Sequence, residues 1–399
     1  MATTDTHLKR RLWYQLKQLG FLRQEDGRLA PALATKDGVR KIHDSQRREK
    51  LRQQRNFVEG KWPALKKYFA DGRDVVPHLI VPELELVESS SWQADLFRLA
   101  SLTWSVPVSN GYGRRLRFLV WDRNIDKLLG LIALGDPVFN LKVRDESIGW
   151  SVKDRKERLV DVLDAYVLGA IPPYNMLLGG KLVASLIRTK EIRDAFSEKY
   201  AGAKGIISKR RKHASLVLVT TSSALGRSSM YNRLILNGQY IFAPIGYTAG
   251  WGHFHIPDRL YSSVRDLLME KNHKYANGHQ FGDGPNWRLR AVRQAFKYLG
   301  LSQNLLHHGI PREVFVCHLA KNANDVLKGT SLTPNYRGLQ SVAAVASQAR
   351  LRWLEPRAIR KPEFRFWNSE QIKAMVINAS PKRTAPETAE EPVRFYGTG

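Results

Sequence analysis

The feature that most constrains the fold is an apolar run near residue 130. Residues 127–134 read KLLGLIAL, and both alternating sets of side chains in this run are apolar. A strand with that pattern is covered on both faces, as in a sheet that lies between layers of helices. A second run, at residues 216–219, predicts another buried strand. The chain is therefore expected to be an α/β protein with a single mixed-sheet core.

Other strands and helices are predicted on both sides of these two runs. Residues 115–121 read as a strand that returns through Asp122-Arg123-Asn124 into residues 127–134. Short strands are expected at residues 146–150 and 240–246. Helical periodicity or helix-start signals are found in seven segments, at residues 8–19, 36–55, 92–102, 157–169, 179–200, 227–236 and 288–299.

Composition changes divide the chain into four expected regions. Residues 1–75 form a basic helical N-terminal region, and residues 76–300 form the α/β core domain. Residues 301–378 are expected to be a mainly helical, basic C-terminal region. Residues 379–399 are rich in Pro, Thr, Glu and Lys, which predicts a disordered tail. The basic helical segments thus flank the core on both sides.

The charge balance predicts a polyanionic partner. Lys and Arg number 64 against 37 Asp and Glu, a formal net charge of +27. Neutralising phosphates releases condensed counterions, so nucleic acid, and DNA first, is the expected partner. A solvated charged surface is the alternative for the basic helix at residues 36–55. The predicted DNA contacts are Arg40, Lys41, Arg47, Arg48, Arg52, Arg55, Lys209, Arg210, Arg211, Lys212, Arg227 and Arg288.

Cysteine content and hydropathy exclude several classes of protein. The single cysteine, Cys317, excludes an intramolecular disulfide framework and a multi-cysteine zinc site. No stretch of 18 uncharged apolar residues occurs, so no membrane partner is expected. Residues 1–9 lack the apolar run of a signal peptide, which indicates a cytoplasmic location.

Two clusters of residues are candidates for binding and catalysis in the core. Gly179-Gly180-Lys181 opens a predicted helix, and paired glycines followed by a lysine favour the binding of a phosphate-bearing cofactor. A tight loop that needs glycine is the alternative. Residues 220–233 follow a predicted buried strand, so they lie at its carboxyl end, where α/β sheets bind ligands. In this segment Tyr231 could donate a proton to a leaving group, while its serines could cap a helix.

Acidic and histidine side chains allow a different chemistry. His253 and His255 would share one face of a strand, and Asp283 could add a carboxylate. The ligand set is incomplete, so no metal ligand is assigned. Asp145, with Asp136 and Asp283, could serve a metal-dependent nuclease, although a salt bridge between Arg144 and Asp145 is the alternative.

Several long strings resemble the DruA proteins of Druantia antiphage defence systems. They are GDPVFNLKVRDESIGW, LGAIPPYNMLLGGKLVASL, TTSSALGRSSMYNRL and GDGPNWR, and the resemblance runs from Trp104 to Arg293. It implies a bacterial cytoplasmic protein that acts against invading DNA together with other components, notably a large helicase-like protein. The family brings no catalytic residues to this chain.

The order of elements between Arg115 and Tyr247 is also similar to the core of GCN5-related N-acetyltransferases. In that core a hairpin leads into a strand, and a glycine-containing loop then binds the pyrophosphate of an acyl-CoA donor. By this resemblance Gly179 and Gly180 would approach the pyrophosphate, and Tyr231 would be the general acid.

Three hypotheses of function follow from these patterns. The first is a DNA-binding defence protein whose acyltransferase-like core modifies nucleic acid. The second is a metal-dependent nuclease or strand-transfer enzyme of defence or mobile-element origin. The third is a non-catalytic DNA adaptor that recruits a helicase.

Overall fold

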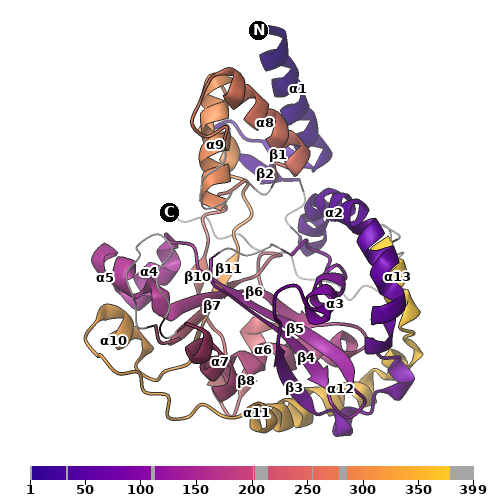
Figure 1. The fold of residues 1–399 in the computed structure, drawn as a ribbon. Coiled ribbons are helices and arrows are strands. Elements are labelled where there is room, and N and C mark those ends of the chain that lie inside the picture. The colour runs from indigo at the N-terminus through magenta and orange to yellow at the C-terminus, as the bar shows by residue number, and fades with distance from the viewer. Residues whose placement is uncertain are drawn as a thin grey trace.

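A computed structural model describes residues 2–32, 35–108, 113–200, 202, 214–253, 255–277 and 285–377. Its centre is a seven-stranded mixed sheet in the order β10-β11-β7-β6-β5-β4-β3 (Figure 1). The only parallel neighbours in this sheet are β6 and β7. This confirms the predicted α/β class with a mixed-sheet core. In sheet order the strands are β10 (Ala243–Tyr247), β11 (Glu313–His318), β7 (Leu218–Ser222), β6 (Val162–Ala170), β5 (Lys127–Gly135), β4 (Arg115–Asp122) and β3 (Pro82–Leu86).

Helices cover both faces of the sheet, as the apolar run in β5 predicts. Leu129, Ile132 and Leu134 pack with α6 (Gly179–Ser185), α7 (Lys190–Tyr200) and α11 (Val342–Ala349). Leu128, Leu131 and Ala133 face the opposite layer. That layer contains the end of α2 (Lys36–Leu65), α3 (Trp92–Ser101) and α13 (Glu370–Ile377) (Figure 1).

A third group of helices covers the part of the sheet around β7 and β11. It consists of α4 (Lys142–Ile148), α5 (Val152–Arg158) and α10 (Ala323–Lys328). Ile148 and Trp150 pack there against Val162, Leu218 and Val316 of three adjacent strands. A last helix, α12 (Glu355–Arg360), follows a π-helical turn at Arg350–Leu354.

A second unit, which we call the head, contains residues 2–32, 249–253, 255–277 and 285–310. It contains α1 (Ala2–Gln18), the hairpin β1 (Phe21–Arg23) and β2 (Leu29–Pro31), α8 (Asp258–Glu270) and α9 (Pro285–Tyr298). In Figure 1 it projects above the sheet. Its apolar side chains form one cluster, in which Leu8, Leu12 and Leu16 of α1 pack with side chains of α8 and α9 and with Val39 and Ile42 at the beginning of α2. The sequence predicted α1 and α9 but not their association across more than 200 residues.

Three predicted elements are wrong. Residues 157–169 are not one helix, because α5 ends at Arg158 and residues 162–170 form the central strand β6. The spacing of Leu159, Leu163 and Val167 matches a helix by coincidence, because Leu159 lies in a 3-10 turn before β6, and Leu163 and Val167 lie in a strand that is buried on both faces. Residues 146–150 include the end of α4 and not a strand, and residues 227–236 contain only a 3-10 turn and the short strand β8 (Ile235–Leu236), which pairs with β9 (Gln239–Tyr240).

The regional boundaries at residues 75, 300 and 378 stay predictions. The C-terminal region is not exclusively helical, since β11 supplies a strand to the central sheet. The predicted disordered tail lies outside the described residues. Among the helices that the structure describes, none has the length and apolar character needed to span a membrane.

Candidate functional sites

The parallel pair of strands marks the main candidate site in the core. β6 and β7 pair only from Val162 to Asp164 and from Leu218 to Thr220. Beyond this point β6 continues to Ala170 along β5, while β7 continues along β11. The ladder between the two strands therefore stops before their carboxyl ends. Open α/β sheets bind ligands outside the carboxyl ends of strands, at points where the chain connections of neighbouring strands diverge. The junction where β6 and β7 stop pairing can therefore hold a ligand.

Tyr231 lies at this junction. It begins the 3-10 turn Tyr231–Arg233 after β7, and its ring packs against Phe242 and Phe315 at centroid distances of 5.3 and 5.2 Å. Burial raises the pKa of Tyr231 to about 12, while a hydrogen bond with the Thr221 side chain opposes that shift. The phenol thus keeps its proton near neutral pH, and its role as a general acid stays a prediction.

A buried glutamate fixes the turn that carries Tyr231. Glu313, at the start of β11, is 6% exposed. Its Oε2 accepts hydrogen bonds from the Ser228 backbone N–H and from Asn232 Nδ2, both at 2.8 Å. Ser228 Oγ in turn accepts from the Tyr231 N–H at 3.0 Å. The sequence analysis did not identify Glu313, because no local pattern connects it with a loop about 85 residues earlier.

The Gly-Gly-Lys segment begins α6, directly after the loop that follows β6. A Cβ on Gly179 would lie 2.6 Å from the Tyr174 carbonyl oxygen, so close packing requires glycine there. A Cβ on Gly180 would lie 3.2 Å from Met230 Sδ, which places the Tyr231 loop against α6. Packing thus accounts for both glycines, and their binding of a cofactor stays a prediction. Lys181 Nζ lies 5.2 Å from the centre of the Trp353 ring.

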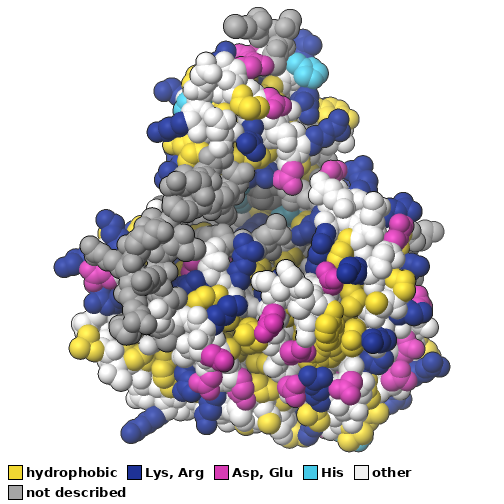
Figure 2. All heavy atoms as spheres, in the orientation of Figure 1, with side chains coloured by type: hydrophobic (Ala, Val, Ile, Leu, Met, Phe, Trp, Pro, Cys, Tyr) yellow, Lys and Arg dark blue, Asp and Glu magenta, His cyan; other side chains and the backbone are white. Residues whose placement is uncertain are grey.

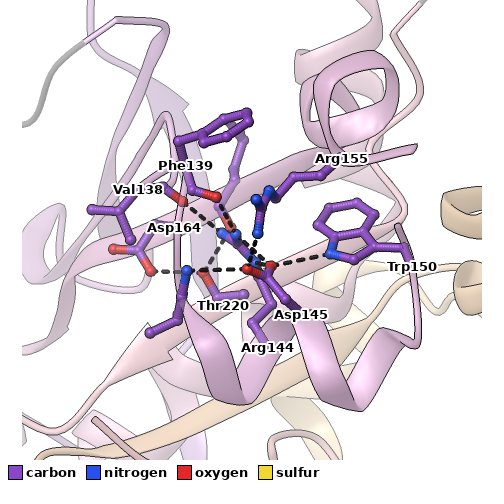
Figure 3. Close-up of polar contacts among 10 residues, drawn as sticks. Val138, Phe139, Arg144, Asp145, Trp150, Arg155, Asp164 and Thr220 are labelled. Atoms are coloured by element: carbon purple, nitrogen blue, oxygen red, sulfur yellow. Dashed lines mark hydrogen bonds and ion pairs between the residues drawn. The ribbon is translucent and has the colours of Figure 1, made fainter. Parts of the chain in front are cut away.

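Asp145 is held in an ion-pair network (Figure 3). Its Oδ1 accepts from Arg144 Nη2 at 2.7 Å and from Trp150 Nε1 at 3.0 Å, and its Oδ2 pairs with Arg155. Arg144 has no exposed side-chain surface and also donates to the carbonyl oxygens of Val138 and Phe139. The salt bridge between Arg144 and Asp145 is therefore present. It holds the β5–α4 loop, and a catalytic role for Asp145 stays a prediction.

Asp164 lies beside this network at the last pair of the parallel ladder (Figure 3). Its Oδ1 accepts a hydrogen bond from Thr220 Oγ1 at 2.7 Å. Burial raises its pKa to about 6, although Thr220 and the charge of Arg144 oppose the shift. Carboxyl groups that titrate near neutral pH are suited to proton transfer. The sequence analysis missed Asp164 because the segment was assigned to a helix.

The other candidates for a metal or nuclease site do not come together in the described part of the chain. Asp136 accepts hydrogen bonds from the Arg114 N–H and Nε, and Asp283 lies outside the described residues. His253 and His255 lie in bends and turns of the head and not on a strand. Burial lowers the pKa of His255 to about 3 and that of His253 to about 4. No group of three His, Cys, Asp or Glu residues suited to a metal occurs among the residues that the structure describes.

Most of the predicted DNA contacts in α2 have protein partners. Arg47 is buried and donates to the carbonyl oxygens of Trp104 and Met375 at 3.0 Å. Lys41 is exposed. The remaining arginines of the helix pair with acids three or four residues away, as Arg40–Asp37, Arg48–Asp44, Arg52–Glu49 and Arg55–Glu59. Four of the nine basic residues of this helix are thus paired with acids of the same helix.

The remaining predicted contacts lie in different places. Arg227 is exposed in the loop after β7. Arg288 of α9 contacts α8 within the head, since its Nη1 pairs with Asp258 at 2.6 Å and its guanidinium lies 4.4 Å from the Tyr261 ring centre. Lys209, Arg210, Arg211 and Lys212 lie outside the described residues.

The head presents a basic surface that the sequence analysis did not identify as a unit. Arg290, Arg293 and Lys297 of α9 are exposed, while Val292 and Phe296 are buried in the head. A depression of about 530 Å³ lies along the basic face, lined by Tyr275, Arg290, Arg293, Gln294, Lys297, Leu301 and Gln303. Residues 285–310 contain four basic residues and no acidic residue. The apolar periodicity of the sequence predicted the amphipathic helix α9, but it did not predict which residues of the head lie beside it.

Comparison with known proteins shows the family. The family model described as "Druantia protein DruA" matches residues 34–329. A protein of that name from Escherichia coli (strain UMEA 4076-1) is 50% identical over 378 residues, which cover 95% of this chain and 94% of the relative. No solved structure matches the chain. On the family match and the near full-length similarity, this chain belongs to the DruA family.

Proposed function

We propose that the chain is a DNA-binding protein of a Druantia antiphage system and that its head holds the DNA. The observation that carries this proposal is α9, which directs Arg290, Arg293 and Lys297 to the outside of a compactly packed unit. Figure 2 shows Lys and Arg side chains spread over the head. A polyanion gains most from cations that have no carboxylate competing for them.

A chain of contacts connects α9 with the hairpin of β1 and β2. Arg293 lies 5.8 Å from the centre of the Trp251 ring, and Trp251 contacts His307 edge to face at 4.3 Å. The His307 carbonyl oxygen accepts from the N–H of Leu29, so the hairpin is fixed beside the segment that follows α9. An α-helix about 10–12 Å wide fits the roughly 12 Å major groove of duplex DNA. We therefore propose duplex DNA as the ligand, with α9 toward the groove.

The test is the salt dependence of DNA binding by matched variants. Arg290→Gln, Arg293→Gln and Lys297→Gln together remove the basic face of α9, and Arg48→Gln, Arg52→Gln and Arg55→Gln remove the same charge from the paired surface of α2. Each phosphate contact adds about 0.9 to the slope of log K against log salt. The first variant should therefore lower the slope by ~2–3. The second should change it little, and equal losses in both variants would refute the assignment to the head.

We further propose that DNA bound by the head is delivered to a helicase-like partner of the same system. The support is the family membership together with a binding surface set apart from the core. Under a purely adaptor role, the α9 variant should lose antiphage protection, while Tyr231→Phe should keep it. Loss of protection in Tyr231→Phe with intact DNA binding would instead favour a reaction in the core.

A second candidate function is group transfer from an acyl-CoA-like donor by the core. It is supported by the divergence of β6 and β7, by the glycine-initiated helix α6 that follows β6, and by Tyr231 at the end of β7. The amine nitrogen of a nucleic acid would form a bond with the acyl carbon as the bond from that carbon to the donor sulfur breaks. The leaving thiolate would take a proton from Tyr231, and the tyrosinate would regain a proton from the acylated nitrogen. Thiol release from acyl-CoA in the presence of DNA tests this function. Undiminished release by Tyr231→Phe would rule out the proposed proton donor.

A further inference from the structure

Three cations from separate parts of the chain converge beside the beginning of α6. Lys181 lies in α6, Arg233 ends the 3-10 turn after β7, and Arg352 lies in the π-helical turn before α12. Arg233 and Arg352 are exposed, and Lys181 is partly buried against Trp353. The helix α6 packs against the π-helical turn that carries Arg352, and the charges of both arginines add to burial in lowering the pKa of Lys181.

The core fixes these positions. Trp353, which lies beneath the Lys181 ammonium, is 6% exposed and belongs to the main apolar cluster. Gly180 admits Met230 against α6, and Met230 accepts at its carbonyl oxygen from the Arg233 N–H at 3.3 Å. The turn that carries Arg233 is therefore held against the helix that carries Lys181.

The cluster has no acidic counterpart among the described residues. The neighbouring acid Glu355 pairs with Arg350 at 3.2 Å, and no ion pair to Lys181, Arg233 or Arg352 occurs in the part of the chain that the structure describes. Gathering like charges costs stability, and a bound polyanion removes that cost. Arginine matches phosphate with two parallel hydrogen bonds, and lysine adds a compact charge.

We propose that Lys181, Arg233 and Arg352 form a binding site for the phosphate groups of a ligand. The ligand class is a diphosphate, as carried by a nucleotide-type cofactor, because three cations exceed the charge of a single phosphodiester. The site lies in the core and is independent of DNA binding by the head. It would supply the donor site of the second candidate function without requiring that acyl transfer takes place.

Calorimetric titration of the full chain with inorganic pyrophosphate tests the site. Each of Lys181→Gln, Arg233→Gln and Arg352→Gln removes a charge-assisted contact and should weaken binding roughly tenfold or more. Arg337→Gln, at an exposed arginine elsewhere on the surface, is the matched control and should bind like the parent. Coenzyme A and a short oligonucleotide, titrated in parallel, distinguish a cofactor from nucleic-acid phosphates.

A second readout protects the test against a misfolded variant. Pyrophosphate should raise the Tm of the parent and of Arg337→Gln, but not that of the triple variant, whose circular dichroism should match the parent. Absence of pyrophosphate binding in the millimolar range would overturn the proposal. So would equal binding by the parent and a folded triple variant.

Discussion

The buried carboxyl group of Asp164 should lower the free energy of unfolding when it is charged, and this cost can be measured. Burial raises its pKa from 3.8 to about 6, even though Thr220 donates to it at 2.7 Å and Arg144 lies nearby. The native state therefore holds the Asp164 proton more tightly than the unfolded chain does. Below about pH 4 the group is protonated in both states and costs nothing. Above about pH 6 it is charged in both states, and the folded state bears the full penalty.

The size of this penalty follows from the shift in pKa. One pKa unit corresponds to about 1.36 kcal/mol, so a shift of roughly two units costs roughly 3 kcal/mol. Asp164→Asn keeps an oxygen that can accept from Thr220 but carries no charge. We expect this variant to exceed the parent in free energy of unfolding by up to roughly 3 kcal/mol above pH 6. The advantage should shrink progressively as the pH falls from 6 toward 4.

Urea denaturation of both proteins between pH 4.5 and 8 measures this difference. Asp266→Asn, at an exposed carboxylate of α8, is the matched control and should show no pH-dependent gain. Titration of the histidines affects parent and variant alike, so it cancels in the comparison. A difference independent of pH, or a variant less stable than the parent at pH 8, would refute the reasoning.

Three further predictions concern stability. Asp145→Asn leaves Arg144 and Arg155 without their shared carboxylate, and urea denaturation should show a loss of about 3–5 kcal/mol, as for broken buried pairs. Gly179→Ala should lower the Tm because its Cβ would lie 2.6 Å from a carbonyl oxygen. Gly60→Ala, with open space in the last two turns of α2, should instead stabilise the protein by up to about 1 kcal/mol. His255, whose pKa is lowered to about 3, contributes stability that is present above pH 6.5 and lost as the pH falls, by up to roughly 1.4 kcal/mol per pH unit. His255→Phe should reduce that slope, and an unchanged slope in denaturation curves would contradict the assignment.

The sequence predicted elements whose signal is local. The hairpin of β4 and β5 and the helices α1, α2 and α9 were recognised from apolar spacing and turn residues. The strand β6 was assigned to a helix because a strand buried on both faces has no alternating pattern. Its apolar positions then satisfy helical spacing by coincidence.

Sites that depend on pairing across the chain were beyond local reasoning. Glu313 supports the Tyr231 loop from a different strand, and burial in the folded sheet raises the pKa of Asp164 although Thr220 opposes that shift. Arg352 lies near Lys181, about 170 residues away in sequence, because α6 packs against the π-helical turn. Composition indicates that a chain is basic, but tertiary contacts decide which cations remain available to a ligand.

The comparison of α2 with α9 shows why the availability of cations, and not their number, indicates where DNA binds. Both helices are rich in arginine, and both were expected to contact DNA. In α2 each acid lies three or four residues from an arginine, so the field of the pair decays over a short distance, and salt weakens it further. In α9 and the residues up to 310 no carboxylate is present in the sequence, and the opposite face of the helix is buried. The basic side chains of α9 therefore cannot form ion pairs with acidic residues of their own helix. DNA should therefore be drawn to the head, although α2 carries the denser basic sequence.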